Sequence, residues 1–196
     1  MTQRTAKVVR ESKETKIDVN INLDGCGKYE GDTGIGFFDH MLSLFAKHGL
    51  LDLYVKAEGD LLVDSHHTIE DVGIVIGSAL KQALKGKEGI KRYGTSFVPM
   101  DETLATVSLD LSGRAYLVFD ANFTVDRLGS FDTEMVEEFF RAVATNAGIT
   151  LHARVLYGKN NHHMVEALFK AFGKALSEAL TYDERIKGVL STKGCL

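Results

Sequence analysis

The sequence predicts an α+β fold made of two similar halves, with helices packed on one face of mainly antiparallel sheets. Two observations lead to this prediction. Residues 14–25 and 102–113 both begin Glu-Thr, alternate apolar and polar side chains and end at Gly, which is typical of β-strands. Residues 66–80 and 162–176 both begin His-His, share Glu, Gly, Ala and Leu at one constant offset, and place apolar residues at helical spacing.

Further elements are predicted between the repeated strand and the repeated helix. Residues 37–49 and 133–148 have the apolar spacing of helices. Each is followed by a short β-rich run, LDLYVKAEGD in the first half and ITLHARVLYG in the second. Each half therefore has the predicted order strand, strand, helix, strand, helix.

The two halves are expected to form one unit. No Pro- or Ser-rich linker separates them, and the one proline, Pro99, lies inside VPMDE. We therefore expect residues 1–196 to form a single domain with an internal duplication. The first half covers about residues 1–91 and the second about residues 92–196.

Composition excludes several classes of protein. The net charge of −4 gives no reason to expect nucleic acid or an anionic membrane as a partner. No apolar run is long enough to span a membrane, and the first residues lack the apolar segment of a secretory signal. Cys26 and Cys195 are too few and too far apart for a disulfide framework or a thiolate metal site. We expect a cytoplasmic protein.

Two copies of His-His-x-x-Glu are the strongest functional signal. They are His66, His67 and Glu70 in the first half, and His162, His163 and Glu166 in the second. Adjacent residues of a helix point about 100° apart, whereas residues three or four apart share a face. Each helix can therefore offer one face to one metal ion and its spare histidine to another. Two matching metal sites explain the doubled motif better than one.

The preceding helix of each half offers a further ligand. His40 lies 26 residues before His66, and Glu138 lies 24 residues before His162. If the repeat is functional, these two residues are counterparts. Imidazole and carboxylate ligands without sulfur suit Mn, Fe, Co or Zn, and Mn becomes credible as oxygen ligands accumulate. His152, in a strand-like run, stays an open candidate.

Basic residues beside glycine and hydroxyl side chains are candidates for an anion site. Arg92 lies in KRYG, Arg114 in SGR, and Lys193 in STKG near the C-terminus. Arg and Lys beside hydroxyl groups and glycine-permitted backbone suit a phosphate group.

These motifs together resemble a known family. In order along the chain they are GDTGIGFFDHML, DSHHTIEDVGIVIG, KRYG, PMDETLA, DLSGR, FDTEMVEEFF, TLH, KNNHHMVEALFKAF and STKG. The sequence is similar over essentially its whole length to imidazoleglycerol-phosphate dehydratase, a lyase (hydro-lyase) of histidine biosynthesis. The resemblance implies two βαββα-type halves like the second domain of ribosomal protein S5. It also implies two Mn²⁺ ions per active site and a homo-oligomer, commonly a 24-mer of trimers, with active sites between subunits.

The resemblance also implies the roles of individual residues. The metal ligands carried over by position are His40, His66, His67, Glu70, Glu138, His162, His163 and Glu166. Glu14 matches the candidate base, and the catalytic set is Glu14, His40, His67 and Glu166. The substrate-binding set is Glu14, His40, His66, His67, Glu70, Arg92, Arg114, Ser191, Thr192 and Lys193, of which the last five would hold the phosphate.

The implied reaction removes water from imidazoleglycerol phosphate to give imidazole acetol phosphate. The metals would stabilise the imidazole ring as imidazolate, so that the hydroxyl group next to the ring can leave. A base then removes the proton from the adjacent carbon. This yields an enol that tautomerises to the ketone.

The chain departs from the more familiar family pattern at two places. It has Glu137-Glu138-Phe139-Phe140 where the pattern reads EHFF, so Glu138 puts carboxylate where imidazole is usual. Its motif at residues 191–194 reads STKG where SSKG is commoner, with Leu190 in place of the usual preceding proline. The first departure exchanges an imidazole ligand for a carboxylate, which can still coordinate a metal ion, and the second preserves the hydroxyl group.

Two other functions are compatible with the motifs taken alone. One is a dinuclear metallohydrolase, in which a metal-bound water attacks an ester or amide. The other is a non-catalytic cage protein that uses metals to staple its subunits. Neither needs an anchor for a distant phosphate, so activity on the phosphorylated imidazole separates them from the dehydratase.

Overall fold

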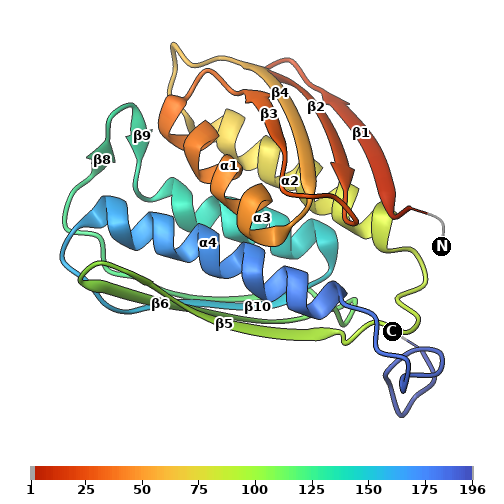
Figure 1. Ribbon diagram of the computed structural model, residues 1–196. Helices are drawn as coiled ribbons and strands as arrows, with labels where there is room; N and C mark the ends of the chain where they lie inside the picture. Colours follow the sequence, from red (N-terminus) through yellow and green to blue (C-terminus); the bar gives the residue numbers. More distant parts are fainter. Residues whose placement is uncertain (1–2, 196) are drawn as a thin grey trace.

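The computed structural model describes residues 3–195 and shows four helices lying between two four-stranded sheets (Figure 1). Each sheet has helices on one face only, and its other face carries the exposed residues of the strands. The α+β class, the two repeated halves and the mainly antiparallel sheets are therefore confirmed. Among the described residues, no helix combines the length and the apolar character needed to cross a membrane.

The first half is built around one sheet with the strand order β1-β2-β4-β3. Its elements are β1 (Thr5–Glu11), β2 (Thr15–Asn22), β3 (Tyr29–Asp32), α1 (Gly36–Gly49), β4 (Asp52–Gly59) and α2 (His66–Leu84). The β1–β2 and β2–β4 pairs are antiparallel, and β3 pairs with β4 in parallel.

The second half repeats this topology with the strand order β5-β6-β10-β7. Its elements are β5 (Tyr93–Met100), β6 (Thr103–Asp110), β7 (Tyr116–Asp120), α3 (Met135–Ala147), β10 (Thr150–Tyr157) and α4 (Asn161–Leu180). A small hairpin of β8 (Arg127–Leu128) and β9 (Phe131–Asp132) is inserted between β7 and α3. This insertion explains why the strand repeat and the helix repeat align at different offsets.

The four-stranded sheet of each half has three strands before the first helix, one more than the sequence pattern predicted. The additional strands include the edge strands β3 and β7, neither of which has a fully buried residue. A strand without buried positions lacks the apolar alternation on which prediction depends. Apart from the inserted β8–β9 hairpin, the order in each half is therefore β-β-β-α-β-α, with more strand before the first helix than the resemblance implied. The division of the halves near residue 91 stays a prediction, and it falls between α2 and β5.

The core lies where the helices meet. The α1 helix packs on α4 and α2 packs on α3, while α2 and α4 also cover the centres of their own sheets. Buried phenylalanine rings fill this core. Phe45 of α1 stacks on Phe172 of α4 at 4.9 Å between ring centroids, and Phe139 of α3 stacks on Phe169 of α4 at 5.2 Å. Rings of this size bury large apolar areas and dominate core packing.

Two glycines at equivalent positions let the helices approach closely. A Cβ atom at Gly77 of α2 would lie 2.7 Å from the carbonyl oxygen of Val143 in α3. A Cβ atom at Gly173 of α4 would lie 2.6 Å from the carbonyl oxygen of Phe45 in α1. Both distances are shorter than any normal contact, so each helix pair depends on its glycine. The repeated Gly of the sequence therefore sets the spacing of the helices that carry the histidines.

Candidate metal and anion sites

The paired histidines occupy the first turns of α2 and α4. The Asn160 side chain accepts hydrogen bonds from the backbone N–H groups of His162 and His163, as expected of an N-cap residue. At the equivalent position of the first half, Asp64 accepts a hydrogen bond of 2.8 Å from the His66 backbone N–H. A side chain at the same position of each half therefore accepts hydrogen bonds from the backbone of the histidine pair, two in the case of Asn160 and one in the case of Asp64.

One compact histidine–carboxylate group forms where α1 meets α4. His40, His162 and Glu166 each offer a ligand atom, and these atoms lie within 4.8 Å of one another. The Glu166 Oε2 atom is 3.1 Å from His162 Nε2 and 3.5 Å from His40 Nε2. Two imidazoles and one carboxylate at this spacing can hold a divalent cation. Within residues 3–195, this is the one group of three ligand atoms that lie so close together.

Glu166 is buried, with a relative exposure of 7%, and it is held in place from several sides. Its second oxygen pairs with Lys170 one turn further along α4. Burial alone would raise the pKa of Glu166, but the hydrogen bond and charge of Lys170 and the contacts with His162 and His40 outweigh it and lower that pKa. Glu166 is therefore an ionised candidate ligand held in a fixed position.

A second, more open group forms where α2 meets α3. His66 Nε2 lies 3.8 Å from Glu70 Oε2, and both side chains are more than 40% exposed. His66 and Glu138 line the same cavity, which has a volume of about 420 Å³. Glu138 also lies 3.6 Å from the Arg141 guanidinium. The predicted counterparts His40 and Glu138 therefore take equivalent places beside the two histidine helices.

The other histidine of each pair points elsewhere, as the helical geometry predicted. The rings of His66 and His67 are steeply tilted, and so are those of His162 and His163. His67 Nδ1 lies 3.0 Å from Asp60 Oδ2, and its Nε2 lies 4.0 Å from the carboxylate of Glu14. The candidate base is thus beside a candidate metal ligand.

His163 has a corresponding carboxylate partner in Glu102. Its Nδ1 atom lies 2.8 Å from Glu102 Oε2. This hydrogen bond raises the pKa of His163, and together with the backbone N–H groups of Asn160 and Lys159 it holds the pKa of Glu102 well below its usual range. The hydrogen bond to Asp60 likewise raises the pKa of His67.

The predicted anion-binding residues meet in one cavity of about 820 Å³. It is lined by Arg92, Arg114, Ser191, Thr192 and Lys193, together with Arg185 and Lys187 from the preceding segment. Five cationic side chains around one hollow suit a phosphate group. Arg92 is already engaged, because it donates to both oxygens of Asp110 and to the carbonyl oxygen of Leu190. Its visible role is to hold the C-terminal segment against the cavity.

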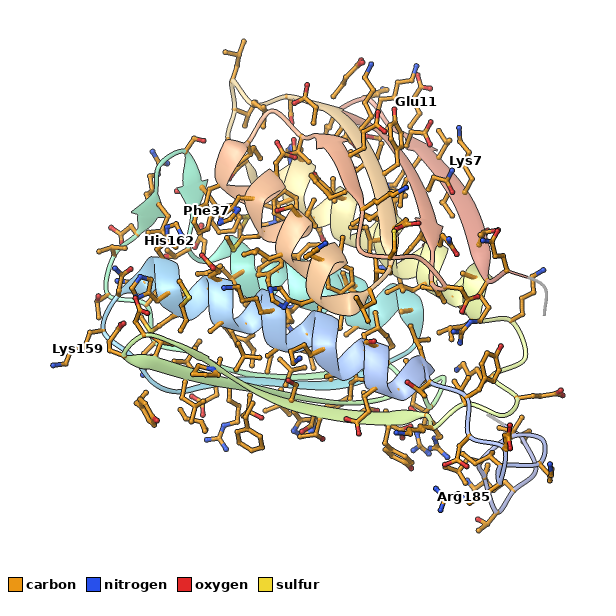
Figure 2. All side chains as sticks on the ribbon, in the orientation of Figure 1. Lys7, Glu11, Phe37, Lys159, His162 and Arg185 are labelled. Atoms are coloured by element: carbon orange, nitrogen blue, oxygen red, sulfur yellow. The ribbon has the colours of Figure 1, made fainter. Side chains whose placement is uncertain are left out.

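The cationic cavity and the compact histidine group lie at opposite ends of α4 (Figure 2). His162 is in the first turn of this helix, whereas Arg185 belongs to the segment that follows its last turn. With 20 residues, the helix is about 30 Å long at roughly 1.5 Å per residue. The cavity and the histidines of one chain therefore do not form one continuous site.

Sequence reasoning missed Glu102 and left the roles of Asp60 and Lys170 open. A signal for Glu102 was present, because it aligns with Glu14 at the start of the repeated Glu-Thr strand. No pattern indicated that Asp60 contacts His67, because that contact joins two elements through the fold. The pairing of Lys170 with Glu166 follows the i,i+4 spacing of one helix, so helical geometry was a signal for it. His152 lies on the exposed face of β10, away from both histidine groups.

The fold and these groups define an α+β protein with a candidate metal centre and a separate cationic cavity. The model of the family "Imidazoleglycerol-phosphate dehydratase" matches residues 33–176. The chain belongs to the imidazoleglycerol-phosphate dehydratase family.

Individual relatives support this assignment over the full length. The imidazoleglycerol-phosphate dehydratase of Clostridium acetobutylicum is 69% identical over 99% of this chain and 98% of its own length. That of Acetivibrio thermocellus is 64% identical over 98% of this chain and 99% of its own.

Solved structures of the family share the fold. The Staphylococcus aureus structure is 46% identical, with a TM-score of 0.83 over 91% of this chain and 99% of that chain. The Pyrococcus furiosus structure is 38% identical, with a TM-score of 0.82 over 96% of this chain and 100% of that chain.

Proposed function

We propose that this chain removes water from imidazoleglycerol phosphate to give imidazole acetol phosphate, as a cytoplasmic enzyme of histidine biosynthesis. The observation that carries the proposal is the combination of two histidine–carboxylate groups with a separate cationic cavity. The first can hold ions against an imidazole ring, and the second can hold a phosphate. Membership of the dehydratase family makes this combination specific to one substrate.

We assign the two groups to two Mn²⁺ ions per active site. The residues that would hold them are His40, His66, His67, Glu70, Glu138, His162, His163 and Glu166. The close nitrogen and oxygen atoms of the α1–α4 group fit a hard or borderline divalent cation. When bound, the ions would act as Lewis acids that favour loss of the proton from the substrate imidazole.

Glu14 is proposed as the base that removes the proton from the carbon next to the departing hydroxyl group. Its carboxylate is half exposed and lies 4.0 Å from His67 Nε2, so it faces the space beside a proposed ligand. The hydroxyl group leaves with its bonding electrons and the carbon gives up its proton, so the balance of the reaction is one water. A positioned base of this kind contributes roughly 10²- to 10⁴-fold to the rate of a reaction.

The cationic cavity is proposed to bind the phosphate group, which does not react. Arg114, Ser191, Thr192 and Lys193 would contact it, while Arg92 holds the C-terminal segment in place. Binding energy from a remote, unreactive group can fix the orientation of the reacting part. The phosphate would therefore orient the imidazole ring between the ions.

The length of α4 supports an active site shared between copies of the chain. A small phosphorylated imidazole is far shorter than the distance of about 30 Å along this helix. The cavity of one copy would therefore serve the histidines of another, and His67 and His163, which point away from their neighbours, would complete the ligand sets. A homo-oligomer, the 24-mer of trimers that the resemblance implies, meets this requirement.

Metal analysis under anaerobic conditions, paired with turnover before and after chelation, tests the proposal. We expect bound Mn²⁺, water elimination from imidazoleglycerol phosphate, and loss of turnover on chelation that added Mn²⁺ restores. Hydrolysis of simple phosphoesters without this elimination would instead support the metallohydrolase. Metal binding without either activity would support the structural cage.

Two variants separate catalysis from assembly. Glu14→Gln and Arg114→Ala should leave the oligomer intact and remove most of the turnover, because one lacks the base and the other a phosphate contact. Arg114 is preferred to Arg92 because loss of Arg92 would leave the carboxylate of Asp110 without its partner. An oligomer whose turnover is unchanged by both variants would contradict the proposed roles.

A further inference from the structure

The two outward histidines, His67 and His163, share a feature that the proposed reaction does not by itself require. In each ring the Nδ1 atom contacts a carboxylate, Asp60 Oδ2 at 3.0 Å and Glu102 Oε2 at 2.8 Å. An ionised carboxylate can only accept a hydrogen bond. In the neutral ring Nδ1 must therefore carry the hydrogen, and the lone pair must lie on Nε2.

Glu102 is held so that one of its oxygens serves His163 alone. Its Oε1 atom accepts hydrogen bonds from the backbone N–H of Lys159 at 3.0 Å, from that of Asn160 at 2.7 Å and from the hydroxyl group of Thr103 at 3.0 Å. Its Oε2 atom accepts the hydrogen bond from His163. The carboxylate is thus fixed by the loop that leads into α4, and its free oxygen faces the histidine ring.

The equivalent residue of the first half has a different place. Glu14 begins the first copy of the repeated Glu-Thr strand and Glu102 the second. The Glu14 carboxylate lies on the Nε2 side of the His67 ring, while the Asp60 carboxylate contacts Nδ1 of the same ring. Asp60 is held less firmly than Glu102, because its Oδ1 atom is buried and accepts no hydrogen bond from the described residues.

We propose that Glu102 is a positioning residue that fixes the ring orientation and the tautomer of His163, so that its Nε2 atom is the one presented to a divalent cation. This inference rests on the proposed function, because it assigns a role within the same site. Carboxylates that orient metal-binding histidines in this way set the ligand geometry and its basicity. The duplicated glutamate therefore orients a ligand in one half and is free to act as a base in the other.

Glu102→Gln tests the tautomer directly. Three donors surround the Oε1 position, so the amide oxygen of the glutamine should take that place and its NH₂ group should face His163. The NH₂ group would then donate to Nδ1, and the ring hydrogen would move to Nε2. Nε2 would then have no lone pair available for a metal ion. The substitution keeps the size of the side chain, and melting temperature and circular dichroism check that the protein remains folded.

The readout is the ¹⁵N nuclear magnetic resonance (NMR) spectrum of metal-free protein that carries ring-¹⁵N histidine. It is recorded at a pH where the ring is neutral. Solid-state spectra suit a large assembly, and the difference from His163→Asn assigns the signal. We expect the Nδ1–H form in the wild type and the Nε2–H form in Glu102→Gln. An unchanged Nδ1–H form in a folded Glu102→Gln protein overturns the inference.

Binding of Mn²⁺ to the metal-free protein gives a second readout that does not depend on turnover. Loss of an outer partner of a ligand typically lowers metal affinity about 10- to 100-fold, and we expect a loss of this size in Glu102→Gln. Asp101→Asn is the matched control, because Asp101 lies 3.9 Å from His163 Nε2 and does not contact Nδ1. It removes the same charge and should keep the wild-type tautomer and the larger part of the affinity.

The two possible failures are distinguishable. A wild-type protein that binds no Mn²⁺ and does not eliminate water overturns the proposed function and the metal-binding role of His163 with it. A wild-type protein that does both, alongside a Glu102→Gln variant with the same tautomer and affinity, overturns the role of Glu102 alone. Equal losses of affinity in Glu102→Gln and Asp101→Asn would also overturn it, because charge rather than orientation would then be responsible.

Discussion

The two halves have the same backbone topology but different histidine–carboxylate groups. The α1–α4 group joins two imidazoles to a buried carboxylate, Glu166, which pairs with Lys170. The α2–α3 group replaces one imidazole by Glu138, and its other carboxylate, Glu70, is partly exposed. At the position of Lys170, the first half has Ile74. The first group is therefore preorganised, whereas the second is open and richer in oxygen.

This difference shows that duplication preserved the packing while the ligand chemistry changed. Packing is constrained by backbone contacts such as those of Gly77 and Gly173, and these contacts are equivalent in the two halves. The ligands are constrained only by the ion and the substrate. Two ions bound to one chain would therefore meet unlike surroundings, and the comparison can be tested by altering one half at a time.

Removing a histidine from each group should have the largest effect. His162→Ala and His66→Ala each delete a proposed ligand, so turnover should be lost, and Mn²⁺ affinity should fall by more than the roughly 10- to 100-fold typical of an outer partner. The loss should be greater for His162→Ala because its group is the more preorganised. Calorimetric titration of each metal-free variant with Mn²⁺ measures the two affinities. The control is His152→Ala on the exposed face of β10, and similar losses in all three proteins would contradict the assignment.

Filling the helix contacts should have the next largest effect. Gly77→Ala and Gly173→Ala each force a methyl group against a backbone carbonyl, and overpacking of this kind costs about 1–3 kcal/mol. Denaturant unfolding measures the loss. Gly36→Ala is the matched control, because nothing lies within 4 Å of a Cβ atom there. We also expect Gly173→Ala to weaken metal binding at the α1–α4 group and Gly77→Ala to weaken it at the α2–α3 group. A stable Gly173→Ala protein would show that the close approach is not needed.

Glu138→His should make the two groups alike. Imidazole in place of carboxylate shifts the preference of a site from Mn²⁺ towards Zn²⁺. Competition between the two ions should therefore favour Zn²⁺ more strongly in the variant than in the wild type, with a smaller change than the loss of a ligand. Arg141→Gln removes the charged neighbour of Glu138 without changing the ligand, and it serves as the control. An unchanged ion preference in Glu138→His would exclude Glu138 as a ligand.

The smallest predicted effect concerns pH at the C-terminal end of α1. Burial, with added repulsion from Lys170 and Lys174, lowers the pKa of His48 below its ordinary value of about 6.5. Below that value the unfolded chain binds the proton more readily than the folded chain, so the contribution of His48 to stability is complete above about pH 6.5 and falls as the pH falls through the folded-state pKa.

The matched variant is His48→Asn, because the equivalent residue at the end of α3 is Asn146. It should flatten the dependence of the free energy of unfolding on pH below about pH 6.5. Denaturant titrations at several pH values measure this slope. A slope as steep as that of the wild type would show that other groups are responsible.

Much of the fold could be predicted because buried elements leave periodic patterns. The alternation of residues 14–25 and the spacing of residues 162–176 correspond to β2 and α4. The edge strands β3 and β7 could not be predicted because neither has a buried residue, so neither carries an apolar alternation. The hairpin of β8 and β9 was likewise missed, because its strands have two residues each.

The sequence predicted which candidate ligands lie together, but not which residues hold them in place. The repeated His-His-x-x-Glu and the helical geometry predicted which side chains share a face, and the grouping of His162 with Glu166 agrees with this. The contact of Asp60 with His67 depends on the path of the loop after β4, and the burial of Lys170 depends on the packing of α4. Neither quantity is encoded in local spacing.

The separation of the cationic cavity from the histidines along α4 has a genetic consequence. On the proposed arrangement, a chain defective only at Arg114 and a chain defective only at His162 are each inactive alone. If the two chains assemble together, an intact cationic cavity from one chain can face intact histidine ligands from the other. Two inactive alleles would then complement each other in one cell, which a catalyst contained within a single polypeptide could not achieve.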